Sequence, residues 1–276
     1  MATFTTAIKK IYSEGLSKHG FKKIKGKQPY FVRTIGDEIV HIITYRTCPT
    51  IIRGHKEFAI YGGIATVYRA CINLEKAPRD NGGWLDKISD FYVKSNSSNI
   101  DKDLFHKITN LSYEEDDEEA MIESIKYSFE MTEKFIIPRL NEVVNIKECV
   151  DFFDKYNTPL LYIDEKDFGK GQNGYEYSEG LLNILIYTSS EYAEREINAH
   201  EKWNEILLHD MKIGINGFTM EEYEIDKEKR KQGIECQIKT FEKMVNDSKE
   251  HKKVMEEIKR CKIANIEILR NYGIDI

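Results

Sequence analysis

The stretch from Pro29 to Tyr68 constrains the fold more than any other part of this 276-residue chain. It contains three segments rich in Tyr, Phe, Val and Ile, namely PYFVRTI (29–35), EIVHIITYRT (38–47) and KEFAIYGGIATVY (56–68). Gly36 and Asp37 separate the first two, and a loop with proline and glycine precedes the third. Such segments, bounded by Gly and Pro, are typical of strands joined by turns. With GFKKI (20–24) before them, they predict an antiparallel meander of about four strands.

The central predicted strand, 38–47, is apolar on both of its faces. Successive side chains of a strand point to opposite faces, so Ile39, Ile43 and Tyr45 lie on one face and Val40 and Ile42 on the other. A strand of this kind needs a cover on each side. We expect the amphipathic helix of residues 4–16 to provide one cover and a later helix the other.

Gly62 and Gly63 interrupt the last of these predicted strands. Glycine inside a strand indicates a β-bulge or a close approach of another backbone. The sequence leaves both alternatives open.

Beyond residue 75 the pattern changes from strands to loops and then to helices. Ser112 and Glu115 have the spacing of a capping box, followed by the acidic run EEDDEE (114–119), and predict the start of a helix that Pro138 ends or kinks. A shorter helix is expected over 146–156.

From residue 176 onward the sequence predicts helices. Two helices are expected to join near Thr188 to Ser190, and Thr219 with Glu222 forms a second capping box. A narrow apolar stripe with many Lys and Glu residues predicts an antiparallel helical hairpin or a partner-binding coiled coil, its residues being Ile234, Ile238, Phe241, Val245, Val254, Ile258 and Cys261. The expected fold class is α+β, with an α+β domain over 1–157 and a mostly helical domain over 158–276.

Charge is distributed unevenly along the chain. Residues 1–75 contain 12 Lys and Arg against 5 Asp and Glu, while the whole chain has a net charge of −6. Five lysines lie in 18–33 near Phe21, Tyr30 and Phe31, which is compatible with a stacking platform for nucleic acid. The same pattern is typical of a half-buried edge hairpin whose lysines discourage edge-to-edge pairing. We favour the edge hairpin and do not expect nucleic acid to be the main partner.

Composition indicates the compartment. No apolar run reaches the roughly 18 to 20 residues of a transmembrane helix, and the N-terminus has no pattern of a secretory signal. Five cysteines, odd in number and scattered, indicate a reducing environment. The expected location is therefore the cytoplasm, with no membrane partner.

Several motifs approach those of known sites without matching them. DFG at 167–169 lacks the other protein-kinase motifs, and FGKGQNG at 168–174 lacks GK[ST]. HEKWNEILLH (200–209) has Asn204 where a zincin has its second histidine, and Glu201, Glu205 and His209 supply only part of a carboxylate-rich site. The sequence therefore predicts no cofactor and no metal ion.

Three side chains of the predicted sheet are candidate catalytic groups. His41 lies on the face of Ile39, Ile43 and Tyr45, and could be a general base or a core histidine bonded to a neighbour. Arg33 and Arg46 are the candidate cations of the same region.

Residues 12–74 carry a family resemblance. SKHGFKK, PYFVRTIGDEIVHIITYR and KEFAIYGGIAT resemble a bacterial family known as a domain of unknown function, and FIIPRLNEVVNIKECVDFF resembles its closing helices. The matching positions are Gly20, Phe21, Lys22, Lys23, Phe31, Arg33, Phe58 and Gly63. The resemblance covers about residues 1–155, departs at Tyr45 and Arg46, and implies a fold without a reaction, cofactor or catalytic residue.

We expect a non-enzymatic bacterial protein that binds another protein, either a toxin-neutralising protein or an adaptor. The C-terminal helices would bind that protein or a second copy of the chain. The alternatives are an enzyme with a site between sheet and helices, using His41, Arg33 or Arg46, and nucleic-acid binding through 18–33.

Overall fold

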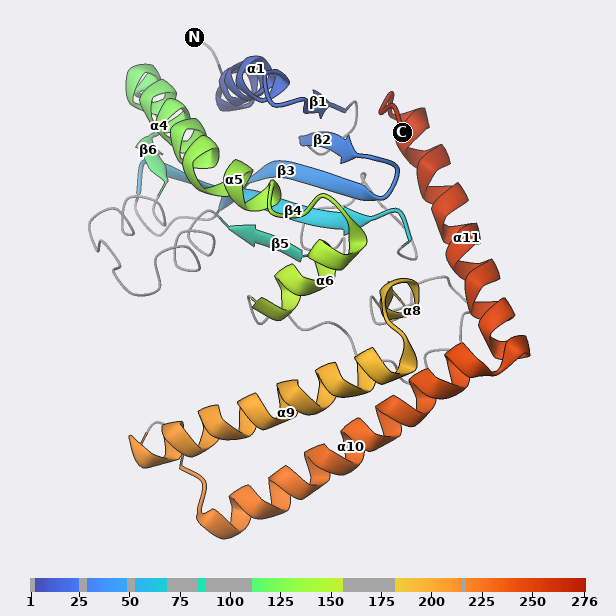
Figure 1. Ribbon diagram of the computed structural model, residues 1–276. Helices are drawn as coiled ribbons and strands as arrows, with labels where there is room; N and C mark the ends of the chain where they lie inside the picture. Colours follow the sequence, from blue (N-terminus) through green and yellow to red (C-terminus); the bar gives the residue numbers. More distant parts are fainter. Residues whose placement is uncertain are drawn as a thin grey trace. The chain divides into compact units, whose positions relative to one another are not determined.

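A computed structural model describes residues 3–24, 29–48, 53–68, 84–87, 111–155, 182–214 and 217–276. The first elements are α1 (Phe4–Ser17), β1 (Lys22–Lys23), β2 (Tyr30–Ile35), β3 (Ile39–Cys48), β4 (His55–Thr66), β5 (Trp84–Lys87) and β6 (Ser112–Glu114) (Figure 1). They are followed by α4 (Glu118–Met131), the π-helix η2 (Thr132–Ile136), α5 (Ile137–Leu140), α6 (Ile146–Lys155), α8 (Asn183–Ile186), α9 (Ser189–Lys212), α10 (Met220–Asn246) and α11 (Ser248–Asn271). The predicted α+β class is confirmed.

The strands form one antiparallel sheet. Its order is β1-β2-β3-β4-β5, and β6 also pairs with β4, so the predicted meander gains two short strands. The turn between β2 and β3 lies at Gly36, whose φ of 58° is in the left-handed region that glycine adopts without strain. Ile35 pairs with Ile39 across this turn, and Arg33 pairs with His41.

The bulge considered at Gly62 and Gly63 is absent from the β3–β4 pairing, so that alternative is wrong. Gly62 pairs with Ile43 and Gly63 with Ile42, inside an unbroken register that runs from Ile39↔Thr66 to Cys48↔Glu57. A bulge requires two residues to oppose one. The two glycines instead occupy ordinary ladder positions.

One face of the sheet is covered by α1 and α4. The Tyr12 ring of α1 lies 6.0 Å from the Phe31 ring of β2 and 5.2 Å from the Phe129 ring of α4. The two helices approach closely at Gly15, because a Cβ atom at this position would lie 2.0 Å from Cζ of Phe129. The buried Tyr12 hydroxyl is 2.9 Å from the Ser128 hydroxyl, so its polar group has a partner.

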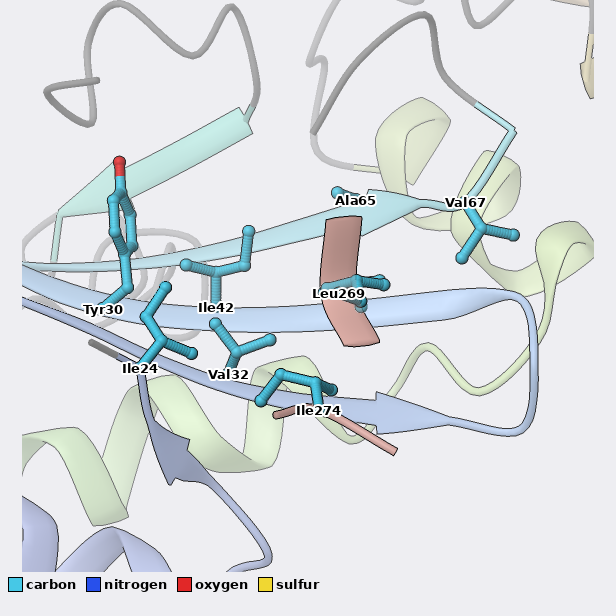
Figure 2. Close-up of a cluster of buried hydrophobic side chains, with 9 residues drawn as sticks. Ile24, Tyr30, Val32, Ile42, Ala65, Val67, Leu269 and Ile274 are labelled. Carbon is cyan, nitrogen blue, oxygen red and sulfur yellow. The ribbon is translucent and has the colours of Figure 1, made fainter. Parts of the chain in front are cut away.

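The end of the chain covers part of the opposite face. Leu269 of α11 and Ile274 pack in a buried cluster with Ile24, Tyr30, Val32, Val40, Ile42, Ala65 and Val67 (Figure 2). Asn265, one turn before Leu269, donates a 2.8 Å hydrogen bond to the Val67 carbonyl. The sheet is thus apolar on both faces, as predicted, but the second face is covered by residues more than 200 positions away.

The helix predicted from the capping box at Ser112 begins later. Ser112 lies in β6, Asp117 is the N-cap of α4, and the Asp117 carboxylate accepts a 2.9 Å hydrogen bond from the Ala120 amide. Tyr113 is buried and stacks on Phe4 at 5.5 Å, which keeps this segment in the sheet. Tertiary burial here overrides the local capping pattern, and the Ser112 prediction is wrong.

Pro138 interrupts the long helix without ending the helical path. Proline has no amide hydrogen and cannot continue the α-helical ladder. The chain adopts the π-helix η2 before it and resumes as α5, where Pro138 occupies the first turn. The helical path continues through Pro138 to Leu140, so the predicted end at Pro138 is wrong, and the kink stays a prediction.

Contacts divide the chain into two compact units, Met1–Pro159 with Cys261–Ile276, and Leu160–Arg260. The domain boundary predicted at 157/158, and the motifs DFG and FGKGQNG, lie outside the described residues. The return of the last 16 residues to the sheet unit was not part of the prediction.

The second unit contains an antiparallel pair of helices, α9 and α10 (Figure 1). Tyr192 stacks on Phe241 at 4.0 Å, and the Tyr223 hydroxyl donates a 3.5 Å hydrogen bond to the Asn204 carbonyl. The predicted hairpin joined residues 234–245 to 254–261 instead. A single residue, Asp247, joins α10 to α11, whereas reversing the chain between helices takes about 2–5 residues. The hairpin is therefore formed by α10 and the helix that precedes it, α9, and not by α10 and α11.

The predicted helix starts of the hairpin are confirmed. Thr188 and Thr219 are N-caps, each in a capping box with the glutamate three residues later. No helix within the described ranges combines the length and apolar composition needed to cross a bilayer.

Candidate functional site

Half-buried Arg33 and buried His41 form a polar pair across β2 and β3. His41 has no solvent exposure. Its Nε2 lies 2.9 Å from the Val143 carbonyl, which can only accept, so Nε2 carries the proton. Its Nδ1 accepts from Arg33, whose Nε and one terminal nitrogen lie 3.2 and 3.1 Å away. Both ring nitrogens are therefore engaged within the protein.

The Arg33 guanidinium connects several segments at this point. It donates a 2.9 Å hydrogen bond to the His19 carbonyl, just after α1, and another to the Asn141 side chain, just after α5. Its central carbon lies 4.5 Å from the centre of the Phe21 ring, where a cation is attracted to the π face. Arg33 thus joins the end of α1, the sheet and the turn before α6.

Electrostatics keep the histidine neutral. Burial and the nearby Arg33 charge lower the pKa of His41 to about 3, although the Val143 carbonyl partly opposes them. Burial also lowers the pKa of Arg33. Because His41 is neutral, buried and bonded at both nitrogens, it has no free lone pair with which to take a proton from a substrate. The geometry describes a structural polar network.

Arg46 does not belong to this network. It lies five residues beyond His41 on β3, at an odd separation that places it on the opposite face of the strand. Its Cα partner is Ala59, whereas that of His41 is Ile64. The structure thus brings together Arg33 and His41, and separates Arg46 from them.

The basic segment 18–33 does not display its aromatic rings. Phe21, Tyr30 and Phe31 are buried, with exposed fractions of 3%, 0% and 1%. A stacking platform needs accessible ring faces, so this interpretation of the three rings is wrong. Lys22 is paired with Asp275 near the C-terminus. Lys25 and Lys27 lie outside the described residues.

A different surface stands out on the α9–α10 hairpin. Five large apolar side chains near the turn between the two helices are exposed by 40–57%, namely Trp203, Ile206, Ile213, Phe218 and Met220. We call this set the apolar tip. Trp203, Ile206 and Asp210 of α9 and its C-cap residue Ile213 follow one another at spacings of three, four and three, which places them along one stripe. Buried Leu207 and Asn204 lie on another side of the helix.

The sequence around the apolar tip is acidic. Residues 201–226 contain seven Asp and Glu against two Lys, whereas residues 227–243 of α10 contain six Lys and Arg against three Glu. Charge therefore changes sign along α10. Sequence reasoning missed this surface because it followed the stripe of 234–261, although the 3-4-3 spacing from Trp203 is visible in the sequence.

Metal ligation finds no support in the described part of the chain, where no group of three or more His, Cys, Asp or Glu side chains could hold an ion. Glu201, Glu205 and His209 lie on exposed positions of α9. Comparisons of the chain with models of protein families, with curated proteins and with solved structures found no match. The resemblance of residues 1–155 to an uncharacterised bacterial family stays a prediction.

Proposed function

We propose that this chain is a non-enzymatic bacterial cytoplasmic protein that acts by binding another protein, with the apolar tip as its binding surface. The observation that carries the proposal is the exposure of five large apolar side chains between Trp203 and Met220 of one hairpin. Contiguous exposed apolar side chains mark interaction sites more often than scattered ones do. Adaptor and toxin-neutralising protein are the two forms of this function.

The energetics of the hairpin support this role. Two helices alone cannot bury apolar side chains that point away from their shared seam. Burying a large apolar side chain such as Trp203 or Ile206 at an interface contributes about 1.5–3 kcal/mol. Tryptophan is also enriched among residues that dominate binding energy. A partner that covers the apolar tip would therefore gain substantial affinity from few residues.

The candidate site in the sheet gives less support to the enzyme alternative. Arg33 and His41 satisfy one another and neighbouring backbone groups, and Arg46 lies on the other face. The resemblance of residues 1–155 to an uncharacterised bacterial family supports the bacterial origin in the proposal and adds no reaction. Binding through the C-terminal helices remains the function with a surface to perform it.

Native affinity purification from a bacterial lysate tests the proposal. The tagged full chain is compared with the tip variant Trp203→Ala/Ile206→Ala and with the matched variant Val144→Ala/Ile263→Ala, which truncates exposed apolar side chains elsewhere. We expect at least one protein to be recovered with the wild type and the matched variant and at least about 10-fold less with the tip variant.

Circular dichroism melting of the three proteins shows whether each is folded. Two results would contradict the proposal. One is that no protein is recovered with the wild type above the level of an untagged control. The other is that recovered proteins are unaffected by the tip variant.

A further inference from the structure

We propose that the partner of the apolar tip presents a basic amphipathic helix. This inference rests on the proposed function and names the chemistry of the partner. Two features of the hairpin support it, namely the shape of the apolar stripe and the charge around it. A third argument is that the described basic regions of a second copy expose no comparable apolar stripe.

The stripe has the geometry of a surface that accepts a helix. Trp203 and Ile206 lie in α9, and Ile213 is its C-cap, ten positions after Trp203; at 1.5 Å per residue this separation is about 15 Å, or nearly three helical turns. Side chains at spacings of three and four form the ridges that pack against another helix. Recognition of an amphipathic helix by such a surface uses apolar anchors at the same spacings.

The charge of the surroundings selects a basic partner. Asp210 lies within the stripe itself, between Ile206 and Ile213, and its side chain is 32% exposed. Glu205 precedes Ile206 directly, and Glu221 follows Met220 directly. An acidic partner would place like charges around a desolvated apolar contact, which opposes binding, whereas Lys and Arg at the rim would favour it and speed association.

In its described residues, a second copy of the chain does not supply this combination. Two apolar tips in contact would bring two strongly acidic segments together. The basic segment 227–243 is fully described, and its large apolar side chains, Ile234, Ile238 and Phe241, are half-buried or buried. In the described parts of the basic N-terminal region, residues 3–24, 29–48 and 53–68, no large apolar side chain is among the exposed ones. The described residues of these two basic regions therefore expose no large apolar side chain, and basic α11 exposes a single one, Ile263, in place of a stripe of anchors.

Titration with synthetic peptides tests the inference on the full chain. The probe is a helical peptide of about 14 residues made of leucine and lysine with leucines on one face, and the control peptide has glutamate in place of lysine. Binding is followed by calorimetry and by tryptophan fluorescence, to which Trp203 and Trp84 contribute. We expect the lysine peptide to bind and the glutamate peptide to bind at least about 10-fold more weakly.

Two pairs of variants locate the binding. Trp203→Ala/Ile206→Ala is expected to weaken binding of the lysine peptide about 30-fold or more, and Val144→Ala/Ile263→Ala less than about 3-fold. Neutralising three acidic residues of the tip is expected to weaken it about 10-fold, and neutralising three exposed acidic residues of α4 to have little effect. The tip set is Glu205→Gln, Asp210→Asn and Glu221→Gln, and the α4 set is Glu119→Gln, Glu123→Gln and Glu130→Gln.

Several results would overturn the inference. Equal losses from the two neutralised sets would show a general charge attraction. Equal binding of the two peptides would show that charge does not select the partner. Equal binding of the lysine peptide to wild type and tip variant would show that the apolar stripe is not the binding surface.

Sedimentation equilibrium separates failure of this inference from failure of the proposed function. A dimer of about twice 32.3 kDa that dissociates in the Trp203→Ala/Ile206→Ala variant would identify a second copy as the occupant. That result would overturn the basic partner and leave the apolar tip as a binding surface. If the native purification also shows no dependence on the tip, the proposed function fails as well.

Discussion

The sheet unit and the α9–α10 hairpin differ in how completely they bury their apolar side chains. In the sheet, Ile39 and Ile43 point to one face and Val40 and Ile42 to the other, and all four are buried. In the hairpin, a single seam around Tyr223 and Phe241 is buried, while the side chains of the apolar tip stay exposed. The sheet has covers from its own chain on both faces. The hairpin leaves apolar surface available for another molecule.

Polar groups show a related difference. His41 is buried with both nitrogens bonded. Within the described hairpin, Oδ1 of Asn204, Oε1 of Gln237 and both terminal nitrogens of Arg230 are buried without a hydrogen-bond partner. In the sheet, the buried groups without a hydrogen-bond partner are smaller and include the hydroxyl of Thr44. Buried polar groups without partners reduce stability, so we infer that the hairpin is the less stable region.

The largest expected effect comes from truncating one phenylalanine in each region. Phe31 and Phe241 are both almost completely buried, at 1% and 0% exposure. Phe31→Ala should lower the free energy of unfolding of the sheet unit by about 3–5 kcal/mol, because it opens a cavity in a core packed on both sides. Phe241→Ala should open the hairpin and change the sheet transition by less than about 0.5 kcal/mol. Hydrogen exchange at increasing urea concentrations measures both regions separately.

Equal loss of protection in β3 and in α10 on Phe241→Ala would contradict the expectation that the two regions unfold separately. The two units would then unfold as one cooperative body. Lower protection of β3 than of α10 in the wild-type chain would reverse the proposed order of stability.

The next effect is a pH dependence specific to the sheet. The pKa of His41 is about 3 in the folded chain, against 6.5 for an ordinary histidine. Below pH 6.5 the histidine is protonated in the unfolded chain but stays neutral in the folded chain. The free energy of unfolding therefore falls as the pH is lowered toward 3. A single group contributes at most about 1.4 kcal/mol per pH unit. His41→Gln should remove this contribution to the slope.

Urea titrations between about pH 6 and about pH 4 measure the slope. The control is His209→Gln, whose parent side chain is 70% exposed on the hairpin, and it should leave the slope of the sheet transition unchanged. An unchanged slope in His41→Gln would argue against the buried, neutral histidine.

The smallest effect concerns the start of α10. Thr219 accepts a hydrogen bond from the Glu222 amide and caps the helix next to the apolar tip. Thr219→Ala should destabilise the hairpin by about 1 kcal/mol, while Lys202→Ala on an exposed part of α9 should change it by less than about 0.5 kcal/mol. Amide exchange in the first turns of α10 measures the difference. Equal exchange in the two variants would mean that tertiary contacts, and not the Thr219 cap, stabilise the N-terminus of α10.

Local patterns were reliable where local forces decide the structure. The strands around Gly36 and the helix starts at Thr188 and Thr219 follow from turn and capping chemistry within a few residues, and all were predicted. The capping box at Ser112 failed because Tyr113 is buried against Phe4, a contact between residues 109 positions apart. For the candidate site, Arg33 and His41 could be placed on one face by strand pairing. Their bonds to His19, Asn141 and Val143 could not, since these come from separate elements.

The sequence by itself determined the α+β class, the strand order of the meander and the two-faced apolar character of β3, because alternation and turn residues act at short range. Tertiary structure decided what covers that sheet: Leu269 and Ile274 arrive from the far end of the chain, and α4 fits against α1 only where Gly15 leaves space for Phe129. It also decided which apolar side chains of the hairpin stay exposed. A helical stripe shows that a face is apolar, but only the packing of α9 on α10 shows that Leu207 lies in their seam and Trp203 does not.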